Sequence, residues 1–185
     1  MNEMFRKTAN RNLHILNSSQ LASGKITMDY ETFSLDELLT DCCSQLLYLA
    51  AKKNVCFEMS TPDNIELYGD PFWLYQAIEN ILKNAIEHTK INGNVRITLE
   101  NHGGNIHLHI QDQGDGILPE ELPRLFQRFH RGDFNKTGYG IGLSMAYDIV
   151  NAHHGTLTAR NLETEKGAYF LITLPQFNKS AIYPK

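Results

Sequence analysis

The spacing of apolar residues along the chain predicts helices in four places. In the most regular one, residues 74–86, apolar side chains recur at the i, i+3, i+4 and i+7 positions of an amphipathic helix. Asp70 and Pro71 precede it as an N-cap and a first-turn proline. The other three helices are expected within residues 5–22, 33–54 and 142–155. Leu47 is expected to point inward from the helix within 33–54, and Ile141 from the start of the helix at 142–155.

Alternation of apolar and polar residues predicts the strands. Residues 94–100 and 105–112 alternate on either side of His102-Gly103-Gly104, which indicates an antiparallel hairpin. His107 and His109 share the face of this hairpin that points away from the core, and we expect them to be solvated. Shorter strands are expected at residues 55–60, 65–69, 156–160 and 168–174. Helices combined with mostly antiparallel strands favour an α+β fold, a two-layer α/β sandwich.

Composition narrows the function classes. The chain has 185 residues and a formal net charge of -4. It has no basic stripe, so we expect no nucleic-acid partner. No apolar run approaches the ~20 residues of a membrane span, and the first residues lack the apolar core of a signal peptide. Cys42, Cys43 and Cys56 have no CxxC spacing, which is typical of reduced cysteines in a cytoplasmic protein.

Two amides interrupt the most regular helix. Asn80 and Asn84 are poor helix formers, and they lie four residues apart on one edge of the helix, beside the buried stripe. Such an edge borders a cleft, where side-chain oxygens can bind a hard cation. Two solvated asparagines explain the same residues equally well.

Asp112 is unusual because it ends the core-facing row of the strand 105–112. A carboxylate in that row needs a dedicated hydrogen-bond donor. Gly114 and Gly116 follow directly and allow a close approach to the backbone. A carboxylate beside bare backbone suits a planar ligand with an exocyclic amine, such as adenine. The alternative is an aspartate that begins a turn, which is common.

A second glycine cluster leads into the helix expected within residues 142–155. Gly138, Gly140 and Gly142 leave backbone N–H groups free at its N-terminus, where the helix dipole favours an anion such as triphosphate. A flexible loop is the alternative. No strand directly precedes the cluster and no lysine follows Gly142, which argues against a Rossmann turn and a P-loop. Taken together, the amides, Asp112 and the glycines predict a Mg-ATP site.

Four segments in this order resemble the motifs of the catalytic, ATP-binding domain of sensor histidine kinases. This family belongs to the superfamily that includes gyrase, mismatch-repair and heat-shock chaperone ATPases. The resemblance covers about residues 33–175, and it implies the Bergerat ATP-binding fold, with a mixed, mostly antiparallel sheet covered on one face by helices. The motifs are the asparagine box "ENILKNAIEHT", the first glycine box "DQGDGI", the phenylalanine box "LFQRF" and the second glycine box "GYGIGL".

The resemblance implies a role for individual residues. Asn84 is expected to be the principal Mg²⁺ ligand, Asp112 to accept a hydrogen bond from the adenine amine, and Arg128 to approach the γ-phosphate. The residues with an expected catalytic role are Asn80, Asn84 and Arg128. Phe126 and Phe129 are expected to anchor the lid. The residues expected to bind the nucleotide are Asn80, Lys83, Asn84, His88, Asp112, Gly114, Gly116, Ile117, Phe129, Arg131, Gly138, Tyr139, Gly140, Ile141, Gly142 and Leu143.

The resemblance also divides the chain and implies partners. Residues 1–27 are expected to be the end of a dimerisation hairpin and a linker, 28–178 the catalytic domain, and 179–185 a tail. His14 does not match the motif of the phosphoacceptor histidine. The implied acceptor is a hairpin domain of the same or a sister chain, and the next partner is a response regulator receiver domain. A homodimer and attachment to a membrane are expected only of a longer parent protein.

Two departures from the family pattern leave other readings open. Glu87 stands where many relatives have a basic residue, and its charge opposes nucleotide phosphate. The lid, "HRGDFNKTGY", is also shorter than usual, although Arg131 or Lys136 could still contact phosphate. The alternatives are a non-catalytic nucleotide-binding module, an anti-sigma-type serine kinase and a gyrase-type ATPase.

Overall fold

The computed structural model describes residues 28–128 and 141–176, so expectations for residues 1–27, 129–140 and 177–185 lie outside the described part. Each helix and strand expected within the described part is present. A short strand, which the alternation did not predict, precedes the first described helix. The elements are β1 (Glu31–Ser34), α2 (Leu35–Ala51), β2 (Cys56–Ser60), β3 (Glu66–Gly69), α3 (Pro71–His88), β4 (Asn94–His102), β5 (Asn105–Gln111), the 3₁₀ turn η1 (Leu122–Arg124), α4 (Gly142–Ala152), β6 (Thr156–Asn161) and β7 (Ala168–Pro175).

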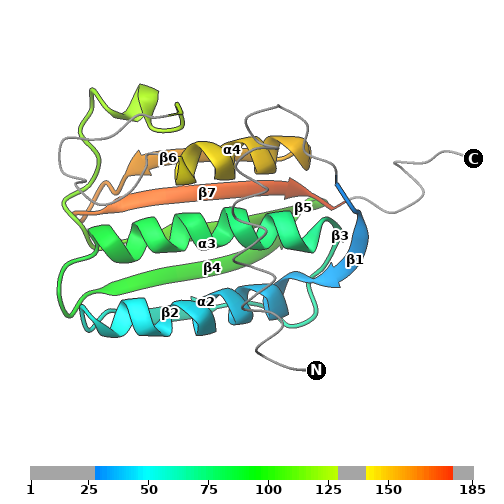
Figure 1. The fold of residues 1–185 in the computed structure, drawn as a ribbon, viewed down its shortest axis with the longest axis horizontal. Helices are drawn as coiled ribbons and strands as arrows, with labels where there is room; N and C mark the ends of the chain where they lie inside the picture. The colour runs from blue at the N-terminus through cyan, green and yellow to red at the C-terminus, as the bar shows by residue number, and fades with distance from the viewer. Residues whose placement is uncertain (1–27, 129–140, 177–185) are drawn as a thin grey trace, which may run out of the picture.

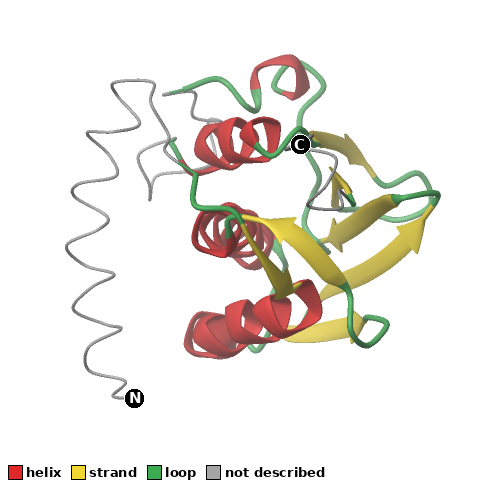
Figure 2. Cartoon of the chain, turned by 90° about the vertical axis from the view of Figure 1, so that its right-hand side faces the viewer, coloured by secondary structure: helices red, strands yellow, loops and turns green. Residues whose placement is uncertain are grey.

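The main sheet has five strands in the order β2-β4-β5-β7-β6. Only β2 and β4 run parallel, and the other neighbours are antiparallel, whereas β1 and β3 form a separate two-stranded ribbon. The helices α2, α3 and α4 lie side by side on one face of this sheet (Figure 1), and the edge-on view in Figure 2 separates the two layers. The predicted two-layer sandwich with a mixed, mostly antiparallel sheet is confirmed.

Helix α3 lies between α2 and α4 and provides the centre of the core (Figure 1). Its apolar stripe is fully buried, and both of its ends are capped by side chains. The Asp70 side chain accepts a hydrogen bond from the Trp73 backbone N–H (3.1 Å) at the N-terminus. At the C-terminus, the Lys53 ammonium donates to the carbonyls of Ile86 (3.1 Å), Glu87 (2.7 Å) and Thr89. The caps hold the helix that carries Asn80 and Asn84 in one position.

Two predicted core positions are wrong. Leu47 of α2 is 58% exposed, and Ile141, the residue before α4, is 39% exposed. Helix α2 buries the neighbouring positions Cys43 and Leu46 instead, because only part of its circumference faces the sheet. Among the described residues, no helix has the length and hydropathy needed to cross a membrane.

His153 links the end of α4 to the start of α3. The Asp70 backbone N–H donates to its Nε2 (3.0 Å), and its Nδ1 lies 2.8 Å from the Ile149 carbonyl oxygen. A carbonyl can only accept, so the imidazole is neutral, with its hydrogen on Nδ1. The ring is buried, and that burial lowers the pKa of His153 below its ordinary value. A Cβ on Gly69 would lie 3.0 Å from this ring, so the space around it is full.

The neutral His153 makes the stability depend on pH. The unfolded chain takes up a proton at this position near pH 6.5, whereas the folded chain takes it up only at lower pH. The contribution of His153 is therefore complete above pH 6.5 and is lost as the pH falls below it. As the pH falls below 6.5, we expect His153 to lower the free energy of unfolding by at most about 1.4 kcal/mol per pH unit. Urea unfolding between pH 7.5 and pH 5 measures this slope.

The matched control for this prediction is His153→Gln. A glutamine has one acceptor and one donor for the same two backbone groups, but it does not titrate in this range. We expect a flatter pH dependence in this variant, with a residual slope to which His109 contributes. Equal slopes in the two proteins would exclude His153 as a source of the pH dependence.

Candidate functional site

The carboxylate of Asp112 lies directly after β5 and is almost entirely buried, with only 1% of the residue exposed. Its Oδ1 accepts hydrogen bonds from the backbone N–H groups of Gly114 (2.9 Å) and Ala168 (3.0 Å). Its Oδ2 is buried and has no hydrogen-bond partner among the described residues. Asp112 therefore ends the core-facing row, as the alternation predicted, and offers one unsatisfied acceptor.

Burial and hydrogen bonding act in opposite directions on this carboxyl. Burial raises the pKa of Asp112 above its ordinary value, while the N–H groups of Ala168 and Gly114 and the charge of His88 limit the rise. A buried acceptor without a partner costs about 1–3 kcal/mol. Such atoms are rare in native proteins and require an explanation. A donor group on a ligand would satisfy this oxygen.

Two glycines allow the backbone to close around Asp112. A Cβ on Gly114 would lie 2.7 Å from the His88 carbonyl oxygen, at the end of α3. A Cβ on Gly167 would lie 2.0 Å from the Asp112 carbonyl oxygen, and Gly167 also has a φ of +144°. Side chains are therefore excluded at both positions. The sequence pointed to Gly114, but Gly167 was missed because its neighbour is 55 residues away, on the other side of the β5–β7 pairing.

The segment that follows Asp112 is held by a residue that sequence reasoning also missed. The Asn161 Oδ1 accepts from the Ile117 N–H (2.7 Å), and the Asn161 Nδ2 donates to the Ile117 carbonyl (2.8 Å). Gly116, with a φ of +87°, passes close enough that a Cβ would lie 2.8 Å from the Asn161 Oδ1. No local sequence signal identifies Asn161, since its partners are backbone groups of a distant loop.

The structure brings Asn80 to the N-terminus of α4. A Cβ on Gly142 would lie 3.3 Å from the Asn80 Oδ1, so the two helices touch where the sequence predicted a phosphate site. Asn80 and Asn84 are both half-buried on α3. The alternative that the sequence left open, two fully solvated asparagines, therefore does not match the environment observed here.

The other α3 residues of the predicted site differ in exposure, and Lys83 is half-buried like the two asparagines. The Lys83 ammonium forms an ion pair with Glu79 one turn earlier (3.0 Å). His88, the last residue of α3, is exposed, and so is Glu87. Helical geometry places Asn80, Lys83 and Glu87 on adjoining edges of α3, so a carboxylate does share the edge on which the amides lie.

The segment of the phenylalanine box contacts α4. The Arg128 guanidinium pairs with Asp148 (2.7 Å), and the Phe126 ring stacks on Tyr147 with centroids 5.2 Å apart. Of the second glycine box, Ile141 is exposed, whereas Gly142 and Leu143 are half-buried. The remaining predicted residues lie outside the described part: Phe129, Arg131, Lys136, Gly138, Tyr139 and Gly140.

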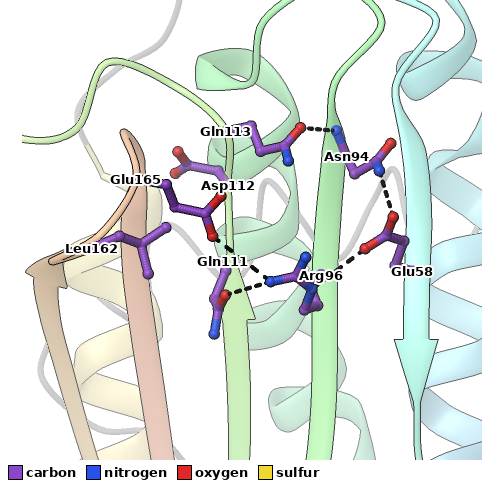
Figure 3. Close-up of a pocket in the computed structure, with 8 residues that line it drawn as sticks. All are labelled: Glu58, Asn94, Arg96, Gln111, Asp112, Gln113, Leu162 and Glu165. Carbon is purple, nitrogen blue, oxygen red and sulfur yellow. Dashed lines mark hydrogen bonds and ion pairs between the residues drawn. The ribbon is translucent and has the colours of Figure 1, made fainter.

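The open face of the sheet carries a separate polar cluster beyond Asp112 (Figure 3). Arg96 of β4 interacts with Glu58 (3.4 Å), Glu165 (3.8 Å) and Gln111 (3.3 Å). The hollow between these side chains is thus lined by groups that already bond one another. Asp112 borders this hollow.

The two histidines on this face are less solvated than expected. His107 and His109 are half-buried, and their rings stack 6.3 Å apart. His109 Nδ1 bonds to the Tyr169 hydroxyl, and burial lowers the pKa of His109. The neighbouring strand β7 supplies the cover, which a single-strand pattern cannot reveal. No group of three or more residues able to bind a metal occurs within residues 28–128 and 141–176.

A helical layer on one face of a mixed sheet, with a buried unsatisfied carboxylate at the end of a central strand, forms a two-layer α/β domain with a candidate ligand site. Residues 69–178 match the family model of histidine kinase-, DNA gyrase B-, and HSP90-like ATPases. The chain belongs to this family. Membership implies that it binds ATP.

The similar proteins of known name are histidine kinases. The chain is 29% identical over 170 residues to sensor histidine kinase RppB of Synechocystis sp., which covers 89% of this chain and 37% of that protein. The structure of the mycobacterial sensor histidine kinase MprB has a TM-score of 0.72 at 27% identity, covering 80% of this chain and 97% of that one. The chain thus spans about two fifths of the length of RppB.

A more distant likeness supports the fold alone. A structure of histidine kinase ThkA in complex with response regulator protein TrrA has a TM-score of 0.73 at 23% identity. It covers 94% of this chain and 50% of that one.

Because a Cβ on Gly167 would overlap the Asp112 carbonyl, Gly167→Ala is expected to be severely destabilising. The backbone conformation and the overlap together are expected to lower the free energy of unfolding by at least about 2–3 kcal/mol. Urea denaturation followed by circular dichroism measures the loss.

The matched control is Gly104→Ala in the β4–β5 turn. Gly104 also has a positive φ, +79°, but no atom lies within 4 Å of its added Cβ. We expect a loss of about 1–2 kcal/mol there, from the backbone conformation alone. Equal losses in the two variants would mean that Gly167 does not pack tightly against Asp112.

Proposed function

We propose that this chain is the ATP-binding catalytic unit of a protein-histidine kinase. It transfers the γ-phosphoryl group of Mg-ATP to a histidine outside residues 28–178, and that histidine passes the group to an aspartate of a response regulator. The observation that carries the proposal is the buried, unsatisfied Oδ2 of Asp112. The histidine kinases RppB and MprB, to which the chain is similar, support the reaction class.

Asp112 is the proposed recognition site for the base. Its free oxygen can accept a hydrogen bond from the exocyclic amine of adenine, whereas guanine has a carbonyl at the equivalent ring position, which cannot donate. The N–H groups of Gly114 and Ala168 hold the other oxygen and so fix the direction in which the carboxylate points. Gly114, Gly116 and Ile117 form the proposed wall beside the base, with His88 at its edge.

The α3 edge is the proposed metal and phosphate site. Asn84 offers a side-chain oxygen to Mg²⁺, with Asn80 beside it against the start of α4. When bound, Mg²⁺ neutralises charge on the β- and γ-phosphates. Backbone N–H groups at the N-terminus of α4 favour the same anion. Further nucleotide contacts are proposed for Lys83, Phe129, Arg131, Gly138, Tyr139, Gly140, Ile141, Gly142 and Leu143.

The proposed reaction is a phosphoryl transfer to nitrogen. A ring nitrogen of the acceptor histidine forms a bond to the γ-phosphorus, the bond from that phosphorus to the β,γ-bridging oxygen breaks, and ADP leaves while the imidazole loses its N–H proton. The protein acts by positioning and charge. Arg128, which pairs with Asp148 in this structure, is the proposed cation for the γ-phosphate.

The partners follow from the reaction. The acceptor is proposed to be a hairpin domain of the same or a sister chain, of which residues 1–27 form the end. The response regulator is proposed by analogy with ThkA, whose structure was solved with response regulator protein TrrA. We also propose that the parent protein is a dimeric, membrane-bound sensor, with this domain on the cytoplasmic side.

Calorimetric titration with ATP, with and without Mg²⁺, tests the site. The unmodified chain should bind ATP more tightly with Mg²⁺ present. Asp112→Asn exchanges the free acceptor for a donor, and it should weaken binding by about 10–100-fold, the value of a hydrogen bond to a charged group. Asn84→Ala should remove most of the Mg²⁺ dependence while some binding remains.

Asp63→Asn is the matched control, because Asp63 is an exposed carboxylate far from the sheet end that carries Asp112. It should bind as the unmodified chain does. Unchanged affinity in Asp112→Asn would contradict the assigned base site. If the chain binds Mg-ATP but transfers no labelled phosphate to an added hairpin domain, Glu87 and the short lid point to the non-catalytic alternative.

A further inference from the structure

Asn161, at the end of β6, clamps the loop that follows Asp112. Its amide oxygen and amide nitrogen engage the N–H and the carbonyl of one residue, Ile117, at 2.7 Å and 2.8 Å. An asparagine side chain can do this because it has an acceptor and a donor side by side. Ile117 lies 44 positions earlier in the chain, so the clamp connects the loop after β5 to the end of β6.

The first half of this loop has other attachments. Gly114 packs against the end of α3, and Gln113 accepts a hydrogen bond from the Asn94 backbone N–H (2.8 Å). Asp115, in the middle, forms an exposed ion pair with Lys90, and such pairs contribute little. In the second half, the backbone of Ile117 is held by Asn161, and the Ile117 side chain packs against the core.

The geometry at Gly116 shows that this contact is tight. Gly116 has a φ of +87°, and a Cβ there would lie 2.8 Å from the Asn161 Oδ1. The glycine thus lets the loop backbone approach the amide closely enough for Ile117 to form both bonds. Gly167, the residue directly before β7, packs on the other side against Asp112. Asn161 and Gly167 bracket the β6–β7 connection that supports the carboxylate.

We propose that Asn161 is a positioning residue that sets the selectivity of the site for adenine. This proposal rests on the proposed function, in which Asp112 accepts from the adenine amine and Gly116–Ile117 form the wall beside the base. Asn161 does not itself contact the base. It fixes the distance between this wall and the carboxylate of Asp112. A guanine ring, which presents a carbonyl to the carboxylate, then cannot move away from it.

Loosening the clamp has a distinct consequence for binding. The phosphate contacts lie on α3 and α4, and they do not depend on Ile117. A variant without the clamp should therefore lose affinity for an adenine nucleotide, while a guanine nucleotide, which binds mainly through its phosphates, is little affected. Selectivity falls, whereas a general loss of folding would lower both affinities together.

Calorimetric titration with ADP and with GDP, in the presence of Mg²⁺, tests this proposal. In Asn161→Ala we expect ADP to bind about tenfold more weakly, the effect of two lost hydrogen bonds, and GDP to change by less than about twofold. Asn161→Asp keeps the shape but sets a carboxylate oxygen against the Ile117 carbonyl, and it should lower the ADP:GDP ratio similarly. Amide exchange at Ile117 should accelerate in both variants.

Asn101→Ala is the matched control. The Asn101 side chain bonds to Gln176 (3.1 Å) near the far end of β4, and its removal should leave the ratio unchanged. An unchanged ADP:GDP ratio in Asn161→Ala and Asn161→Asp would overturn the role of Asn161, even if their melting temperatures fall. If the unmodified chain binds neither nucleotide, the proposed function fails first, and this inference fails with it.

Discussion

The arrangement around Asp112 depends on one constraint: a carboxylate is buried at the end of a central strand with only half of its acceptors satisfied. The strand pairing β5–β7 brings the Ala168 N–H to one oxygen, and the absence of side chains at Gly114 and Gly167 lets the backbone close around it. Burial of apolar side chains elsewhere in the core offsets the free-energy cost of leaving the second oxygen desolvated. The two backbone N–H groups and the close approach of Gly114 and Gly167 hold the carboxylate in place.

Helix α3 connects this carboxylate to the core and to α4. Its buried apolar stripe packs against the sheet. Its C-terminal residue His88 contacts Gly114, and its Asn80 side chain contacts Gly142. The Lys53 cap fixes the end of α3 nearest the carboxylate. A shift of α3 along its axis would therefore move Asn80, Asn84 and the contact with Gly114 together, whereas Gly116 and Ile117 are held by Asn161 of β6. One rigid element thus carries both predicted metal and phosphate ligands, Asn80 and Asn84, which is the kind of preorganisation that phosphoryl transfer requires.

The sequence alone predicted much of this, and the failures have a common physical reason. Period-two alternation placed Asp112 in the core-facing row, and period-3.6 spacing placed Asn80 and Asn84 on an edge, because both depend only on local geometry. Leu47 was placed in the core wrongly, since periodicity does not say how wide a face the neighbours cover. Asn161 and Gly167 were missed because their partners are backbone groups far away in the sequence, which carry no residue-specific signal.

The unsatisfied oxygen of Asp112 also explains why such a site can select its ligand. In an exposed site, a ligand amine only exchanges one hydrogen bond with water for another, and the net gain is small. Here the acceptor is buried, so a ligand with a donor offsets part of its desolvation cost, and a ligand with a second acceptor adds repulsion to it. Selectivity of this kind requires that the carboxylate cannot turn toward solvent. The two backbone N–H groups on Oδ1 prevent that rotation. In the proposed function, the free energy that burial of Asp112 costs is offset only by a ligand that donates a hydrogen bond to it.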